Sequence, residues 1–259
     1  MMMRTFHRRI RHRRPATERE RRRRIVLPPT REMTLHLMAA PHTGGTRQQG
    51  AQLCRMDLHG ADLSGANLHA AALNFADLHT ACLRDACLQG AHLEHADLGD
   101  TDLRVADMRG VCLRRANLQA ADLSCADLRC AVLEMANLKG AVIEQANLQS
   151  AYLGFAWLEG ANLRHADLGF ADLAGADLRD ADLRGADLVG ANLQHANLRG
   201  ADLRGASLQD AYLEHADMRG ALLDGISLQQ ASLRMPCPGT SARRTGATCA
   251  GAAAESAPR

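Results

Sequence analysis

Residues 51–235 repeat a five-residue unit, with Ala first, Asp or Asn second and Leu third, without a single insertion or deletion. The third position is Leu in 34 of the 37 units, and the first position is Ala in 33 of them. A short, strict period is typical of one structural unit stacked many times, in which each copy contacts mainly its neighbours. Such a pattern leaves little room for a unique set of reactive side chains, so it argues against an enzyme.

A period of five fits neither regular secondary structure. On an α-helix, successive Leu would be about 500° apart and would spread over the whole surface. On a flat strand, where side chains alternate between two faces, an odd period would send successive Leu to opposite faces. A coil that turns a corner once per unit lets Ala and Leu face inward together, and the small and large side chains then fill a narrow interior. The sequence therefore predicts such a coil.

Units such as residues 166–170 (ADLGF) and 201–205 (ADLRG) resemble the pentapeptide repeat family. The resemblance covers residues 51–235 and implies an all-β fold, a right-handed quadrilateral parallel β-helix with four units per coil and Leu in four internal ladders. About nine coils would form a rod of about 43 Å at the usual spacing of about 4.8 Å. The resemblance also implies that the Asp before each Leu supports the turn by bonding to nearby backbone.

The residues before the central Leu, sorted in steps of 20, test the expected coil. Three of the four columns hold Asp or Asn at 20 of 27 positions, whereas the fourth holds them at two of ten. We therefore expect one side of the rod to differ from the others. The unusual column consists of Gln52, Ala72, His92, Cys112, Val132, Tyr152, Asp172, Asn192, Tyr212 and Ser232.

Charge divides the chain into three segments. Residues 1–50 form a basic arm with 13 Arg and 3 Glu, the repeats 51–235 carry 25 acidic and 15 basic residues, and residues 236–259 form a short tail. The polar composition of arm and tail predicts disorder. The arm is either an unstructured extension, with Met33 or Met38 as a later start, or a segment that binds nucleic acid or another anionic surface. A start at Met33 would change the net charge from +2 to −7.

Reactive side chains do not form a recognisable site. No two of the eight Cys are 20 residues apart, so we expect free thiols in a reducing cytoplasm, with disulfides or a metal as the alternative. His59 with His79 and His195 with His215 would stack as surface ladders. We find no phosphate-binding loop, no catalytic motif and no apolar run long enough for a membrane span. The sequence predicts no catalytic residue, no metal ligand and no cofactor.

Two classes of function remain. The first is a scaffold that presents its rod to another protein. The second is a DNA mimic that binds DNA gyrase, because some members of the family that this chain resembles imitate duplex DNA and protect against quinolones. Duplex DNA would carry about 25 negative charges over the length of this rod, but the repeats have a net charge of −10. Stacked arginines two residues after an Asp or Asn would neutralise part of that charge, which favours the scaffold: Arg164, Arg184, Arg204, Arg179, Arg199 and Arg219.

Aromatic residues are clustered, because four of the seven fall within 19 positions. By the repeat register all four point outward, so the Leu core does not explain them. We read them, with residues one coil earlier, as a protein-interaction patch, although repair of packing at an irregular corner is the alternative. The candidate patch consists of Val132, Met135, Tyr152, Phe155, Trp157 and Phe170.

The last coil departs from the pattern at Leu222 and Ile226, and no cap is evident in the tail that follows. Uncovered coil ends expose backbone groups and apolar side chains. We therefore expect a homodimer formed end to end through the C-terminal coil.

Overall fold

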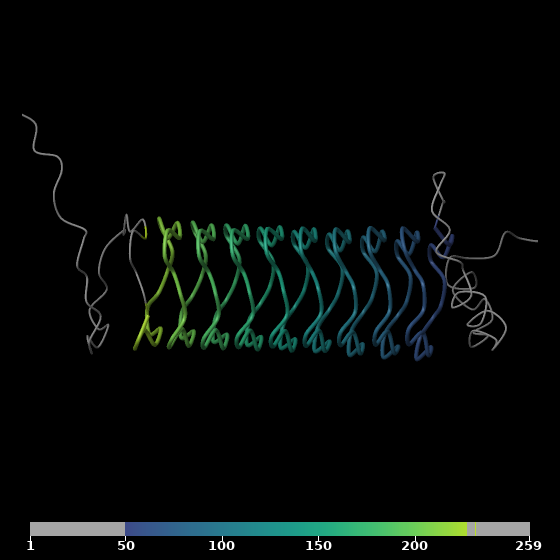
Figure 1. Ribbon diagram of the computed structural model, residues 1–259, viewed down its shortest axis with the longest axis horizontal. Coiled ribbons are helices and arrows are strands. Elements are labelled where there is room, and N and C mark those ends of the chain that lie inside the picture. Colours follow the sequence, from purple (N-terminus) through teal and green to yellow (C-terminus); the bar gives the residue numbers. More distant parts are fainter. Residues whose placement is uncertain (1–49, 227–230, 232–259) are drawn as a thin grey trace, which may run out of the picture.

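The computed structural model describes residues 50–226 and residue 231. In this part of the chain there is no helix, and no strand is longer than the single residue with which each unit forms a parallel β-bridge. Bridges join residues 20 apart, from the pair of Gln52 and Ala72 to the pair of Asp202 and Leu222. Four units therefore make one coil, and the coils stack in a single row as a rod (Figure 1). The fold is a parallel β-helix.

Each coil has four faces, one unit wide. We number them by their first central residue: face 1 begins with Leu53, face 2 with Leu58, face 3 with Leu63 and face 4 with Leu68, and each continues in steps of 20. The 35 units of residues 51–225 form eight complete coils and three units of the next. The end of the predicted ninth coil, nearly all of the predicted arm and the tail from residue 236 lie outside the described residues.

Each unit ends in a turn. The backbone N–H of the first residue of the following unit donates to the carbonyl of the central residue, as from Ala61 to Leu58 at 3.0 Å. The fifth residue always has a φ between 51° and 76°, a feature of type II turns. Only 13 of these residues are Gly and 22 are not. Because a left-handed conformation costs a non-glycine residue about 1–2 kcal/mol, the core and the bonds between coils must offset a repeated strain.

The core consists of the central residues and the first residues of the units. From Leu53 to Leu213, each central residue is at most 7% exposed, and Met108 and Ile143 are buried in the same way as Leu. Burying each Leu contributes about 1.5–3 kcal/mol. Thr101 is the one buried polar residue among the described residues, and its hydroxyl donates to the carbonyl oxygen of Leu78 at 2.9 Å.

The last described coil is less buried than the rest. Leu222 occupies the second position of its unit, where side chains point outward from the face, and it is 46% exposed on face 3. Ile226 is partly buried and packs against the core. The two residues predicted as dimer contacts thus have different surroundings, and the end-to-end homodimer stays a prediction.

Truncating a core Leu in the middle of the rod should destabilise the protein far more than truncating an outward one. We expect Leu153→Ala, at a fully buried position, to lower the free energy of unfolding by about 2–5 kcal/mol. Leu222→Ala should change it by no more than about 0.5 kcal/mol. Urea unfolding followed by circular dichroism measures both, and equal effects would contradict the assignment of inward and outward positions.

Candidate functional site

The Asp or Asn at the second position of a unit satisfies a backbone donor. In the unit of residues 96–100, four of the five backbone N–H groups donate to backbone carbonyls, and the fifth, that of Gly99, donates to a side chain. The N–H of Gly99, the fourth residue, donates to Oδ1 of Asp97 at 3.1 Å, and the N–H of Arg184 bonds in the same way to Asp182 at 3.2 Å. The turn-supporting role that the resemblance implied is confirmed.

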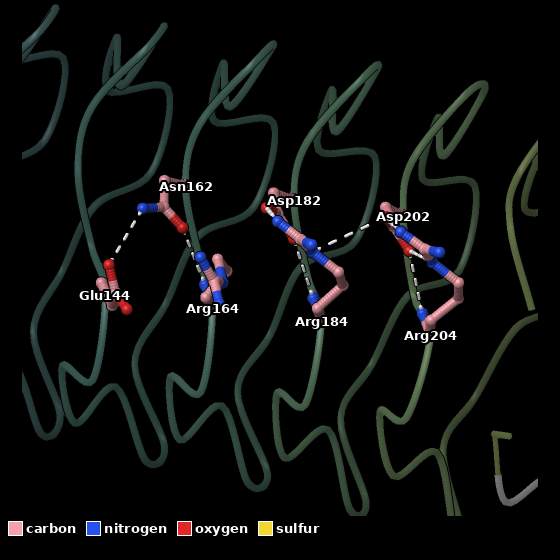
Figure 2. Close-up of polar contacts among 7 residues, drawn as sticks. All are labelled: Glu144, Asn162, Arg164, Asp182, Arg184, Asp202 and Arg204. Atoms are coloured by element: carbon pink, nitrogen blue, oxygen red, sulfur yellow. Dashed lines mark hydrogen bonds and ion pairs between the residues drawn. The ribbon is translucent and has the colours of Figure 1, made fainter. Parts of the chain in front are cut away.

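Arginine at the fourth position then pairs with this Asp. Figure 2 shows two such pairs on face 3, in which Nε of Arg184 and of Arg204 lies 2.8 Å from Oδ1 of Asp182 and Asp202. A second bond joins Nη2 to Oδ2 in each pair. The predicted neutralisation is therefore confirmed for these arginines. Seven bidentate pairs occur in the described residues: 102/104, 107/109, 127/129, 177/179, 182/184, 202/204 and 217/219.

Two of the predicted arginines lack such a pair. Arg164 follows Asn162, whose Oδ1 accepts the backbone N–H of Arg164 and whose amide donates to Glu144 (Figure 2). Arg199 likewise follows an asparagine, Asn197, and donates its backbone N–H to it. Within the described residues neither guanidinium forms an ion pair. An Asn at the second position thus keeps the turn but not the neutralisation.

Histidines and cysteines form no metal site in the described residues. The predicted histidine ladders are present: the rings of His59 and His79 stack at 5.4 Å, and those of His195 and His215 at 4.8 Å. The six described cysteines are free thiols. In the same part of the chain no helix has the length and hydropathy to cross a membrane.

Face 1 differs from the other faces, as the sorted columns predicted. It adjoins a corner that we call the aromatic corner, formed by the fifth residues of its units. The guanidinium of Arg55 lies 5.4 Å from the centre of the Phe75 ring, and that ring stacks on His95 at 4.9 Å. No acidic residue occurs in this column, which consists of Arg55, Phe75, His95, Arg115, Met135, Phe155, Gly175, His195 and His215.

A groove of about 750 Å³ lies between the aromatic corner and face 2 and spans three coils. It brings together three members of the predicted patch, Met135, Phe155 and Trp157. Sequence reasoning missed the other residues of the groove, although steps of 20 from Met135 and Trp157 lead directly to three of them. The missed residues are Arg115, Ala116, Asn117, Gln119 and Asn137.

The other predicted residues of the patch do not line this groove. Val132 and Tyr152 occupy second positions of face 1, beside the aromatic corner, and Tyr152 is half exposed. Phe170 occupies the corner between faces 4 and 1, on the far side of face 1. It is the most exposed large apolar residue of the described chain, at 70%. Phe170 therefore belongs to a separate surface.

Gly175 makes space for the ring of Phe155. A Cβ atom at Gly175 would lie 2.6 Å from that ring, closer than any real contact. Gly175 is the one glycine of the aromatic corner, and it follows Phe155 by one coil. The ring therefore lies against the backbone of the next coil, where it forms one wall of the groove.

A β-helix with a Leu and Ala interior, repeated turns and no assembled reactive site defines a solenoid repeat protein. The sequence pattern described as pentapeptide repeats matches this chain in eight copies between residues 49 and 235. The chain belongs to the pentapeptide repeat family. Membership supports the right-handed coil that the resemblance implied.

Several solved structures are similar to this chain. HetL, a pentapeptide repeat protein involved in heterocyst differentiation regulation in Nostoc sp. strain PCC 7120, is 35% identical, with 73% of this chain and 90% of HetL covered and a TM-score of 0.32. A pentapeptide repeat protein from the Arabidopsis thaliana thylakoid lumen is 36% identical over 40% of this chain and 65% of its own, with a TM-score of 0.20. QnrB1, a plasmid-mediated fluoroquinolone resistance protein, is 19% identical over 70% and 91%, with a TM-score of 0.30. No curated protein matches the chain.

Acid should weaken the pairs between Asp and Arg. The hydrogen bond from Arg219 is the main cause that lowers the pKa of Asp217 from 3.8 to about 2. Because the folded-state pKa is depressed, this pair stabilises the fold above pH 3.8 and is lost as the pH falls towards 2. We expect Asp217→Asn to be less stable than the parent at pH 7, and the difference to shrink as the pH is lowered through this range.

Thermal unfolding at several pH values measures that difference. The matched control is Asp172→Asn, which removes a carboxylate from a unit that has Ala174 in place of the arginine. A difference between Asp217→Asn and the parent that stays constant from pH 7 to pH 2 would contradict the pairing.

Proposed function

We propose that this chain is a non-enzymatic scaffold that presents one side of its rod to another protein. The observation that carries the proposal is the concentration of exposed apolar side chains at the aromatic corner and on the faces beside it. Phe155 and Trp157 are more than half exposed, and Met135 and Tyr152 about half. Such patches mark interaction sites, and Trp, Tyr and Met are enriched at the centres of interfaces.

The remaining surface supports this choice by contrast. On faces 2, 3 and 4 more than half of the charged side chains of the described residues form ion pairs with one another, which leaves fewer charges for a ligand. The free thiols are consistent with a reducing compartment, and we propose the cytoplasm. We describe the partner only as a protein that contacts the aromatic corner and the faces beside it.

Removing the aromatic side chains should abolish binding without unfolding the rod. A pull-down from the native host identifies the partner, and we expect Trp157→Ala to weaken its binding by about 2 kcal/mol, the scale of an interface hot spot. The Tyr152/Phe155/Trp157 triple alanine variant should bind still less. Because Trp157 uses only its backbone in the ladder, the fold should survive, which circular dichroism checks.

Phe170→Ala is the matched control for these variants. It also removes an exposed aromatic ring from the rod, but on the far side of face 1. Unchanged binding by the folded triple variant would mean that Tyr152, Phe155 and Trp157 have only a structural role.

The alternative function is a DNA mimic that binds gyrase. The described repeats carry 25 acidic and 14 basic residues, and ten of those basic residues are ion-paired. Eleven of the 25 carboxylates are paired with Arg or Lys, so the surface is a weak copy of a duplex with about one negative charge per 1.7 Å of its axis. The chemistry of the surface therefore favours the scaffold.

Gyrase supercoiling assays separate the two functions. We expect the purified protein to leave supercoiling by the gyrase of its own organism unchanged at low micromolar concentration. Inhibition that weakens as salt is raised, as an electrostatic interaction should, would instead support the mimic.

A further inference from the structure

The groove at the aromatic corner contains an unpaired positive charge. Within the described part of the chain no carboxylate pairs with the exposed guanidinium of Arg115, and no acidic residue lines the groove. Glu134 is bonded to Arg114 at 2.6 Å and Glu159 to Lys139 at 2.9 Å, and within the described residues no ion pair joins Glu94, one coil earlier, to Arg115. The charge of Arg115 is therefore available to an anionic group of a ligand.

Two asparagines add hydrogen-bond donors to the same groove. The side-chain amide of Asn137 donates to Oδ1 of Asn117 at 2.9 Å, and that of Asn117 donates to Asp97 at 2.8 Å. Both Oδ1 atoms also accept a backbone N–H, from Lys139 and Gln119, which fixes the orientation of the amides. Each Nδ2 carries a second hydrogen with no partner in the described residues. The groove thus offers mainly donors and favours a ligand rich in acceptors.

The apolar wall of the groove fits a large side chain. Met135, Phe155 and Trp157 are exposed side by side, and the Phe155 ring is seated against Gly175. The groove extends over three coils, or about 10 Å between the first and the third, which is the length of about three extended residues. An extended peptide supplies carbonyl acceptors along that length as well as side chains.

We propose that this groove binds an extended segment of a partner protein. A large apolar side chain of the segment inserts between Met135, Phe155 and Trp157, and an Asp or Glu close to it in sequence pairs with Arg115. This inference rests on the proposed scaffold function, and it specifies the chemistry of the partner. Arg115 and the two asparagines then determine specificity, while the apolar side chains supply most of the affinity.

Single-stranded nucleic acid is less suited to the same surface. Its bases could stack on Trp157 and Phe155, but its phosphates need cations along the whole path of the strand. Only Arg115 supplies a cation in the groove, and acidic residues outnumber basic ones in the described repeats by 25 to 14. The balance of charge therefore favours a peptide.

Selection from a displayed library of random peptides on the full chain tests the proposal. We expect the selected peptides to combine a large apolar residue with a nearby Asp or Glu. Trp157 is the sole tryptophan of the chain, so a synthetic copy of a selected peptide should shift the protein's tryptophan emission to shorter wavelength. Arg115→Glu should weaken binding at least about tenfold, the loss expected for a charge-assisted hydrogen bond.

Arg199→Glu is the matched control, because it makes the same change of charge at an exposed, unpaired arginine two coils beyond the groove. Its binding should equal that of the parent. Selected peptides without acidic residues, equal binding by Arg115→Glu, or an unchanged emission would each overturn the proposal. So would an oligonucleotide that shifts the emission when no selected peptide does.

The outcomes also separate this proposal from the scaffold function. A host partner that needs Trp157 but tolerates Arg115→Glu would leave the scaffold in place and overturn the ligand chemistry. A partner that still binds the triple alanine variant would instead show that Tyr152, Phe155 and Trp157 do not form the interaction surface.

Discussion

One backbone N–H per unit has no place in the ladder of the β-helix. In a coil of four five-residue units, the other four N–H groups reach carbonyls of the same turn or of a neighbouring coil, but the N–H of the fourth residue does not. Asp or Asn two residues earlier supplies the missing acceptor, as Asp97 does for Gly99. Because these two positions point to the same side, an Arg at the fourth position meets the same carboxylate. The ion-paired surface of the rod therefore follows from the requirement of the turn.

Face 1 shows what happens where this arrangement is relaxed. There the N–H of Glu94 donates to an acceptor in the preceding coil, Oδ1 of Asn74, 3.0 Å away. Elsewhere on this face, Val132 and Tyr152 replace the Asx residue and provide no such acceptor. An unsatisfied donor costs about 1–3 kcal/mol when buried and less where water reaches it. The aromatic corner borders this face, which departs from the rule of the repeat.

The periodicity was enough to predict the coil, its interior and the unusual face, because each depends on a spacing that the sequence states directly. Contacts within the surface were harder to predict. Phe170 is near Trp157 in sequence, but the chain passes two corners and the whole of faces 3 and 4 between them. Asn117 and Asn137 look like ordinary repeat residues, and only their position under Trp157 gives them a place in the groove. The position of the Phe155 ring over Gly175 depends on a side-chain rotamer, which no spacing specifies.

The equivalence of the units has a consequence for how such a chain can change in evolution. Loss or duplication of one five-residue unit would leave every remaining Leu in the core and every turn intact, so the β-helix would be retained. Yet every later residue would move round the rod by one face, and a change between Met135 and Phe155 would end their stacking. Duplication of a whole 20-residue coil would keep all columns aligned. The core therefore tolerates changes in length of one unit, whereas the alignment of the surface columns requires changes of four units.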